Sequence, residues 1–417
     1  MENEKVRVIV TTDSEIDDKC SMIRFLMHTN DFDVEGIISV NSKWQKDGHG
    51  EIWIHEMIDK YAQVYPNLIK HDKNYPTPEH LHSVTWQGLV DRAPIYAAAP
   101  PYRDTKGSDL IIDKLLDEDL RPVHVLMWGG GTMVAHAMWK IKHEYSSADF
   151  DHAVNKIRMY FIDYQEHGTG GGKWLRENIS DALNILDYQF VGTWNYRPRK
   201  DQPYEDYMGT EWLNKHVKQN HGPLGEEYYG MHGGDLYVSE GDSPSFLWLV
   251  NNGLRSQERP DFGGWGGRHT NTGANQWNDA QDDGDTRKPL WRWTPATQND
   301  WATRMDWGVK SYEEANHPPV VIVDGELDRT VSPGEIITLS ATRTYDPDGD
   351  DLMYTWWQYY DADTVDTKID ITNPSSPSEA GFVVPDEKGK DIHIILEVQD
   401  NGEPTLTRYQ RLIFTIQ

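Results

Sequence analysis

The segment Val8-Ile9-Val10-Thr11-Thr12-Asp13-Ser14-Glu15-Ile16-Asp17-Asp18-Lys19-Cys20-Ser21-Met22-Ile23 decides the fold of this chain. It begins with β-branched residues, passes through a loop that holds three aspartates, and continues with apolar residues at Ile16, Cys20, Ile23 and Met27. That spacing is typical of one helix face, so the segment predicts a strand, an acidic loop and a helix. In open α/β sheets, ligands bind outside the carboxyl ends of strands, where this loop would lie.

The three aspartates allow two interpretations. If Asp13, Asp17 and Asp18 converge on one point, they repel one another unless a cation lies among them, and a set of oxygen ligands favours Ca²⁺ or Mg²⁺ over zinc. Alternatively, Asp17 and Asp18 lie where a helix begins, and aspartate is favoured there by capping and by the helix dipole. Capping accounts less well for Asp13. The residues alone leave both interpretations open.

Composition limits the classes of partner. The chain has 417 residues, with 40 Lys and Arg against 68 Asp and Glu, a formal charge of −28. The electrostatic field of this negative charge repels phosphate backbones and anionic membranes, so we expect neither nucleic acid nor a membrane as partner. No apolar run approaches the roughly 20 residues that span a bilayer. The 17 Trp and 21 Tyr favour a carbohydrate ligand, although Trp also fills protein cores.

The chain contains one cysteine, Cys20, which excludes an intrachain disulfide and a cysteine-based zinc site. Its first residues lead directly into a strand and do not form an apolar leader. A polysaccharide partner would nevertheless require export. We therefore expect a secreted or periplasmic protein whose signal peptide is absent from this sequence, with a cytoplasmic protein as the alternative.

Strands and helices alternate over the first 190 residues. We expect strands at 34–40, 122–128, 156–163 and 183–186, a helix at about 51–65 and an irregular stretch at 66–105. This alternation predicts an α/β fold with a doubly wound, mainly parallel sheet and helices on both faces. The run Gly129-Gly130-Gly131-Thr132 follows the 122–128 strand but lacks the Lys-Ser/Thr pair of a P-loop.

The pattern is looser between about 190 and 316. Asp242 precedes Ser243-Pro244 and an apolar run, which is typical of a helix cap. A second group consists of tryptophans, and it predicts either a wall for stacking sugar rings or a tryptophan-lined minor core: Trp265, Trp277, Trp291, Trp293, Trp301 and Trp307. The irregular stretches at 66–105 and 255–316 could form a pocket rim or an oligomer interface, and homo-oligomerisation stays open.

The sequence pattern changes at residue 317. Short alternating strands separated by turn residues fill the last 100 residues or so, which predicts an all-β, immunoglobulin-like sandwich at 317–417 after an α/β domain at 1–316. The segment Asp346-Pro347-Asp348-Gly349-Asp350-Asp351 resembles loops of cadherin-like and polycystic-kidney-disease-type modules. A plain Asp-Gly turn is the simpler interpretation, and a second Ca²⁺ site is the alternative.

The spacing Asp13-x-x-x-Asp17-Asp18 after an apolar strand resembles the N-terminal motif of the inosine-uridine nucleoside hydrolases, which bind Ca²⁺ through these aspartates. Longer stretches of the sequence are more similar to the cellulose-binding, nucleoside hydrolase-like family, whose members carry a C-terminal sandwich. The stretches that carry this resemblance are Thr11 to Asp18, Ser21 to Leu26, Trp128 to Thr132, Glu240 to Leu247 and Gly263 to Arg268.

The resemblance implies a Ca²⁺ site formed by Asp13, Asp17, Asp18, a backbone carbonyl at Thr132, and Asp242. Asp13 would also be the base that takes a proton from the attacking water, and an oxocarbenium-like sugar carbon would be attacked. It further suggests a set of substrate-binding residues around the metal: Asn41, Gln165, Glu166, Trp174, Trp265 and Arg268.

The sequence departs from the nucleoside hydrolases at the leaving-group side. Ser14-Glu15 replaces their Pro-Gly, Gly241 stands where a histidine often precedes the late aspartate, and their Glu-Phe-Asn segment is missing. Nucleosides are therefore doubtful substrates. Glu240 or Glu166 is the candidate acid, unless each has only a structural role.

Two functions follow from these expectations. The first is a Ca²⁺-dependent hydrolase that acts on a glycosidic bond of a carbohydrate or glycoside. The alternative is a non-catalytic protein that binds cellulose or another carbohydrate on a nucleoside hydrolase scaffold, because Gly241 leaves the acid position empty.

Overall fold

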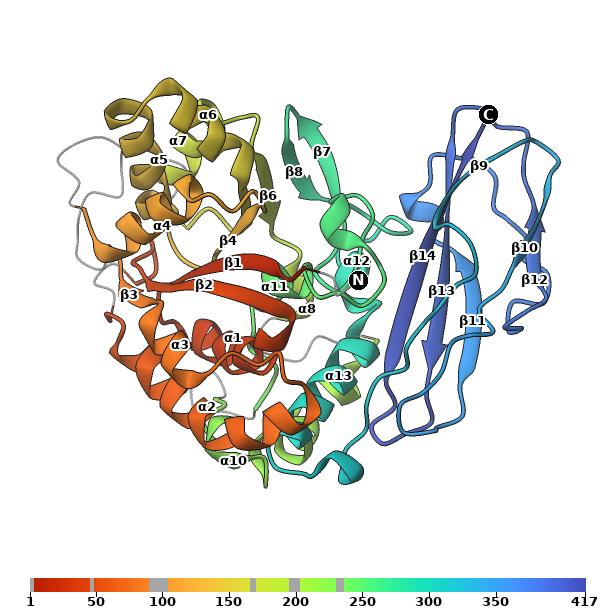
Figure 1. Ribbon diagram of the computed structural model, residues 1–417, viewed down its shortest axis with the longest axis horizontal. Coiled ribbons are helices and arrows are strands. Elements are labelled where there is room, and N and C mark those ends of the chain that lie inside the picture. The colour runs from red at the N-terminus through yellow and green to blue at the C-terminus, as the bar shows by residue number, and fades with distance from the viewer. Residues whose placement is uncertain (1–3, 46–48, 90–103, 166–169, 195–202, 230–235) are drawn as a thin grey trace.

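The computed structural model describes residues 4–45, 49–89, 104–165, 170–194, 203–229 and 236–417. A large sheet flanked by helices forms the first part of the molecule, and a strand-rich body lies against one side of it (Figure 1). This arrangement confirms the predicted fold class, an α/β sheet followed by a β-structured C-terminal part.

The large sheet has eight strands in the order β3-β2-β1-β4-β5-β6-β8-β7. All neighbouring pairs are parallel except β7 with β8. The strands are β1 (Val6–Thr12), β2 (Phe32–Ser39), β3 (Thr85–Gln87), β4 (Val123–Met127), β5 (Ile157–Ile162), β6 (Leu183–Asp187), β7 (His269–Gly273) and β8 (Gln276–Asp279). The sheet is therefore mainly parallel, with β4 and β5 at its centre.

Helices cover the sheet and the loops beside it. The α-helices are α1 (Ile16–Met27), α2 (Ile52–His71), α3 (Pro78–Ser83), α4 (Lys106–Leu116), α5 (Thr132–Glu144), α6 (Ser147–Lys156), α7 (Gly171–Asn178), α8 (Phe190–Thr193), α9 (Thr210–Leu213), α10 (Gly222–Glu226), α11 (Ser243–Leu247), α12 (Lys288–Trp291) and α13 (Thr294–Trp307). Shorter turns are η1 (Thr29–Asp31), η2 (Glu205–Tyr207), η3 (Asn214–Lys218), η5 (Ser256–Glu258), η6 (Tyr312–Glu314) and η7 (Tyr360–Ala362).

Both faces of the sheet are buried, as the alternation of side chains along β1 shows. Val8 and Val10 belong to the hydrophobic core that contains residues of α1, α2 and α13. Ile9, between them, belongs to the core that contains residues of α4 and α5. Because successive strand residues point to opposite faces, a strand with helices on both sides needs a continuous apolar run.

Two of the stretches predicted as irregular contain regular structure. The helix expected at about 51–65 continues to His71 as α2, because Leu68 extends its buried face beyond Pro66, and α3 and β3 follow. The 14-residue helix α13 lies inside the region predicted to be loop-rich. It is buried on nearly every side, so its sequence carries no amphipathic period. Residues 90–103 of the first stretch lie outside the described ranges.

The C-terminal body contains two sheets, one with the order β11-β13-β14-β9 and one that pairs β10 with β12. Their strands are β9 (Asp328–Val331), β10 (Ile336–Leu339), β11 (Met353–Gln358), β12 (Ala380–Val383), β13 (Asp391–Gln399) and β14 (Thr407–Ile416). The apolar run at 320–323 predicts a strand, but the structure has only an isolated bridge there, between Val320 and Tyr345. The sequence pattern also missed β9, which is short and mostly polar.

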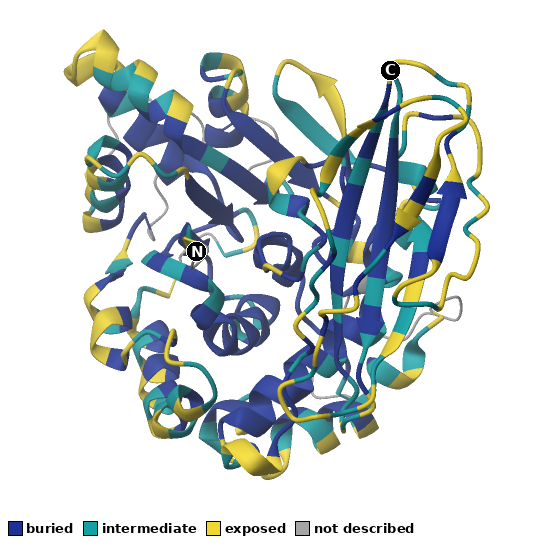
Figure 2. Ribbon diagram, turned by 45° about the vertical axis from the view of Figure 1, so that its right-hand side comes forward, coloured by how far each residue is buried: buried dark blue, intermediate teal, exposed yellow. Residues whose placement is uncertain are grey.

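The two parts of the chain share a core. Ile394 and Leu396 of β13 pack inside the C-terminal body, whereas Ile395 belongs to the core of the first part. The backbone N–H groups of Tyr409 and Arg411 donate to the carbonyls of Asn252 and Gly253, at 2.9 and 3.0 Å. Figure 2 shows buried strands where the C-terminal body meets the rest of the molecule. The boundary at 317 stays a prediction.

Within the described ranges, no helix combines the length and the apolar character needed to cross a membrane.

Candidate functional site

The acidic loop after β1 lies at the carboxyl edge of the sheet, as its sequence predicts. Asp18, in the first turn of α1, accepts hydrogen bonds from the Thr12 hydroxyl and, at 2.9 Å, from the Asp13 backbone N–H. Both donors precede the helix, and the N-cap residue Glu15 makes no side-chain capping bond. Asp18 therefore connects the loop to the helix through these hydrogen bonds, and it is not a capping residue of the helix. One oxygen of Asp13, Oδ2, is buried and has no hydrogen-bond partner among the residues that the structure describes.

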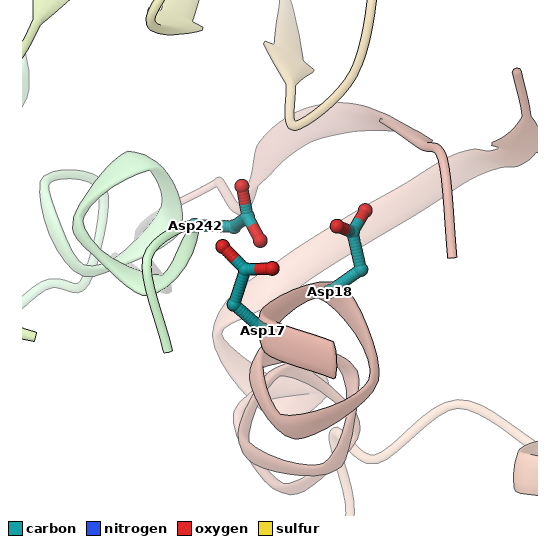
Figure 3. Close-up of side chains that lie close together, drawn as sticks. All are labelled: Asp17, Asp18 and Asp242. Carbon is teal, nitrogen blue, oxygen red and sulfur yellow. The ribbon is translucent and has the colours of Figure 1, made fainter. Parts of the chain in front are cut away.

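Asp242 comes from a distant part of the chain and joins this loop. One carboxylate oxygen from each of Asp17, Asp18 and Asp242 lies within 4.8 Å of the others (Figure 3). Asp242 is 1% exposed, and within the described part of the chain neither of its carboxylate oxygens has a hydrogen-bond partner. It precedes α11 without making a side-chain capping bond, so the helix-cap interpretation from the sequence does not account for it.

The electrostatics of this cluster are unfavourable without a positive charge. Burial, reinforced by the neighbouring carboxylates, raises the pKa of Asp18 and of Asp242 well above the ordinary value. Burial also raises the pKa of Asp13. Burial and the charges of Asp13 and Asp17 raise the pKa of Glu15 to about 8. Buried carboxylates without donors are stable when they coordinate a cation, and an oxygen-only set suits Ca²⁺.

The glycine-rich turn after β4 lies against the acidic loop. A Cβ atom on Gly129 would lie 3.0 Å from Cβ of Asp13, so glycine allows this close approach. Thr132 begins α5 at the same edge and is 1% exposed. Asn41 follows β2, and its carbonyl accepts a hydrogen bond from the Gly130 N–H at 3.0 Å. The fold thus brings Asn41 and the turn that leads to Thr132 beside the aspartates.

Glu240, the first candidate acid, is anchored in the core. Its Oε2 lies 2.7 Å from Nε of Arg24, and its carboxylate also accepts hydrogen bonds from Tyr228 and Ser243. The Arg24 guanidinium lies over the ring of Trp301. Burial raises the pKa of Glu240 and the charge of Arg24 opposes that shift. These contacts hold the Glu240 carboxylate in the core, and its catalytic role stays a prediction.

The other predicted sugar-binding residues are dispersed. Gln165 lies at the edge, where its Nε2 donates to the Trp128 carbonyl, while its buried Oε1 has no partner in the described ranges. Glu166 lies outside the described residues. Trp174 of α7 packs against the helix-covered core, with the Lys142 ammonium 5.7 Å from its ring centre. Trp174 therefore belongs to the helical layer.

The tryptophan-rich region forms a core. Trp265 is 0% exposed, so its ring has no free face for a sugar, and Arg408 from β14 lies against it. Arg268 is committed to an ion pair with Asp282, at 2.8 Å. Of the two interpretations, the structure supports a tryptophan-lined core for the buried members of this group, Trp265, Trp293, Trp301 and Trp307.

Residues that the sequence did not indicate form the rim of the site. Lys43 and Trp44 lie two and three residues after Asn41, and the Lys43 ammonium pairs with Asp163 at 2.6 Å. Asp163 comes directly after β5 and has a left-handed φ of 57°. Their positions directly after strands were a signal, because parallel strands end at one edge of the sheet.

A second acidic group lies in the C-terminal body, at Asp346, Asp348 and Asp350. Oδ1 of Asp346 accepts the backbone N–H groups of Asp348 and Asp350, and Gly349 has a φ of 86°. These contacts form the Asp-Gly turn that the sequence predicts. His317 donates its backbone N–H to Asp348 at 2.7 Å.

The fold and the acidic site together define a nucleoside hydrolase-like protein. A family model described as cellulose-binding Sde182, nucleoside hydrolase-like domain, matches residues 7–269. A second model, cellulose-binding protein Sde0182, C-terminal domain, matches residues 336–416. The chain belongs to this family of cellulose-binding, nucleoside hydrolase-like proteins, as its sequence motifs suggest. No curated protein matches the chain.

Solved structures agree with this family. One similar structure is a nucleoside hydrolase-related hypothetical protein from Saccharophagus degradans, described as associated with carbohydrate metabolism. It is 32% identical, has a TM-score of 0.85, and the match covers 99% of this chain and 100% of that chain. The effector protein XOO4466 (8% identity, TM-score 0.41, 74% and 95% coverage) and the plant nucleoside hydrolase PpNRh1 (10%, 0.34, 73% and 99%) match too weakly to support an argument.

Proposed function

We propose that this protein binds Ca²⁺ and uses it to hydrolyse a glycosidic bond of a carbohydrate. The observation that carries the proposal is Asp242, a buried carboxylate with two unpartnered oxygens beside Asp17 and Asp18. Such a group costs several kcal/mol if it stays ionised and unpaired, and a cation removes that cost. Asp13 and the carbonyl of Thr132 complete the proposed set of oxygen ligands.

The nature of the ligands supports Ca²⁺ in particular. Carboxylates and a carbonyl are hard oxygen donors, and Ca²⁺ takes six to eight of them in flexible geometry. When bound, Ca²⁺ would supply a Lewis acid and an anchor for two neighbouring sugar hydroxyls. The family's cellulose-binding description and the relative's association with carbohydrate metabolism support a carbohydrate substrate.

The residues of the chain supply the remaining steps. Asp13 receives the Glu15 backbone N–H on Oδ1, at 3.3 Å, and leaves Oδ2 unpartnered. That oxygen is available to accept the proton of an attacking water. Glycosidic cleavage then proceeds through an oxocarbenium-like transition state, which the surrounding carboxylates stabilise by their negative charge.

A specific observation favours the second candidate, carbohydrate binding without catalysis. Residue 241 has no side chain, and Glu240 is held in an ion pair with Arg24. Neither residue supplies a proton to a leaving group. A glycoside with a poor leaving group would then bind without being cleaved, because acid catalysis typically contributes about 10²- to 10⁴-fold to the rate.

The experiment compares wild-type protein with Asp13→Asn and Asp242→Asn on cello-oligosaccharides, aryl glycosides and nucleosides, with Ca²⁺ or with chelator. Asp151→Asn, an exposed aspartate on α6, is the matched control. We expect hydrolysis by wild type and control that is lost with chelator and in both site variants. Turnover that survives chelation and both substitutions would contradict the proposal.

Binding to insoluble cellulose separates the two candidates. Retention of the wild-type protein with no sugar or base released from any substrate supports binding alone. Release of reducing ends supports the hydrolase.

A further inference from the structure

Trp44 differs from every other tryptophan of the chain. The structure describes the side chains of all seventeen, and Trp44, 61% exposed, is the one that lies in the exposed class. Most of the others lie in the cores or against them. An exposed indole offers a large, flat apolar face on which a ligand can stack.

The segment that carries Trp44 lies next to the acidic loop. Ser42 Oγ accepts the backbone N–H groups of Trp44 and Gln45, each at 3.0 Å. Burial raises the pKa of Asp13 and of Glu15, and the Ser42 and Gln45 side chains, respectively, oppose these rises, so both side chains lie near the acidic loop. The Val40 N–H donates to the Thr12 carbonyl at 2.8 Å, so the turn that carries the exposed ring begins beside the acidic loop.

Lys43 fixes the ring from one side. Its ammonium lies 4.8 Å from the Trp44 ring centre and 2.6 Å from Oδ2 of Asp163, and its backbone N–H donates to the Gln165 carbonyl at 2.7 Å. A cation held by a carboxylate orients the indole through its quadrupole. Tyr188, 47% exposed, lies near the same Asp163, because burial and this carboxylate raise the pKa of its hydroxyl. The Lys43–Asp163 ion pair therefore has two exposed aromatic residues in its surroundings, Trp44 and Tyr188.

We propose that Trp44, with Tyr188 near the same Lys43–Asp163 ion pair, is a stacking platform for a second sugar unit of an oligosaccharide whose first unit lies at the carboxylates. This inference rests on the proposed function and specifies its substrate as a chain of sugars, not a monosaccharide. The apolar face of a pyranose packs on an indole, and the charged Lys43 and Asp163 suit its hydroxyl groups. A ring held in place before binding loses little conformational entropy.

The experiment measures binding of glucose, cellobiose and cellohexaose by calorimetry in the presence of Ca²⁺. The variants are Trp44→Ala and Trp44→Phe, with Tyr145→Ala as the matched control, since Tyr145 is 44% exposed and follows α5 at its far end. For cellohexaose we expect Trp44→Ala to bind about tenfold more weakly than wild type. We expect an intermediate loss in Trp44→Phe and no change in Tyr145→Ala.

Other outcomes of these measurements distinguish failure of the stacking platform from failure of the calcium site. Equal cellohexaose affinity in wild type and Trp44→Ala, or no cellohexaose binding by wild type, overturns the platform. So does a loss in Trp44→Ala that is as large for nucleosides as for cellohexaose. The rise in unfolding temperature produced by Ca²⁺ should be the same in Trp44→Ala as in wild type. If Ca²⁺ produces no such rise in wild type, the calcium site has failed and not the platform.

Discussion

Gly241 and Asp17 are packed so closely that a Cβ atom on residue 241 would lie 2.7 Å from Asp17 Oδ2. The same atom would lie 3.2 Å from the Phe190 ring. The absence of a side chain at 241 and the placement of the carboxylates are therefore linked. A residue that restored a leaving-group acid at this position would displace one of the proposed calcium ligands.

We expect Gly241→Ala to weaken Ca²⁺ binding, by about tenfold, while leaving thermal stability nearly unchanged. The reason is that the flexible carboxylate of Asp17 can move away from the new methyl group and thereby leaves its position in the cluster. Calorimetric titration with Ca²⁺ measures the effect. Gly209→Ala is the control, because a Cβ atom there meets nothing within 4 Å. Equal Ca²⁺ affinity in both variants would contradict this account.

We expect Asp242→Asn to have opposite effects with and without metal. Without Ca²⁺, the substitution removes one of several mutually repelling buried carboxylates, so the unfolding temperature should rise. With Ca²⁺ at a hundred times its dissociation constant, wild type should gain about 2.7 kcal/mol and the variant much less. Thermal unfolding measured with Ca²⁺ and with chelator tests both the expected rise without metal and the expected smaller gain with metal. A variant that is destabilised equally in both conditions would point to a packing role for Asp242.

Asp300 of α13 is shared by two arginines, one from each part of the chain. Its carboxylate lies 2.7 Å from Arg304 and 2.7 Å from Arg408 of β14. Burial alone would raise the pKa of Asp300, but the two guanidinium groups overcome it and hold the pKa well below the ordinary value of 3.8. A depressed pKa contributes stability that is present above about pH 4 and is lost as pH falls further.

We therefore expect Asp300→Asn to lower the free energy of unfolding at pH 7 by about 3–5 kcal/mol, because two buried arginines lose their counter-charge. The difference from wild type should shrink below pH 4. Urea denaturation across pH 3 to 8 measures it, with Glu177→Gln, in an exposed pair with Lys173, as the control that should change by under about 0.5 kcal/mol. A difference that does not depend on pH would contradict the electrostatic explanation.

Arg411 of β14 joins the two parts of the chain by a different contact. Its buried guanidinium donates to the carbonyls of Leu254, Phe262 and Gly263, at 2.7 to 2.9 Å. We expect Arg411→Leu to leave these carbonyls without a donor and to cost about 3 kcal/mol or more. Calorimetry should also show a broader transition, or two, since the parts are less tightly coupled. A single sharp transition at the wild-type temperature would contradict this prediction.

The strand–loop–helix unit at the start of the chain could be predicted from local pattern. Val8, Ile9 and Val10 are buried on both faces of β1, so each is apolar, and the helix face from Ile16 to Met27 repeats at helical spacing. The same logic predicted the strands β2, β4, β5 and β6. It failed for α13, which is buried on nearly every side and therefore shows no period.

The sequence by itself determined which residue types are available at the site. It supplied three aspartates after a strand, a late aspartate before Ser-Pro, and a glycine where an acid was expected. Family resemblance could match Asp242 to the loop, but local pattern alone favoured a helix cap. The order of residues carries no information on which oxygens lack donors.

Only the tertiary structure decided how these residues are used. It placed Asp242 within reach of Asp17 and Asp18, fixed Glu240 on Arg24, and left Trp44 exposed beside the carboxylates while Trp265 was buried. The physical reason is that burial and pairing depend on contacts between residues far apart in the chain. A carboxylate becomes a candidate metal ligand, and an aromatic ring a candidate sugar platform, only when the surrounding fold supplies no other partner.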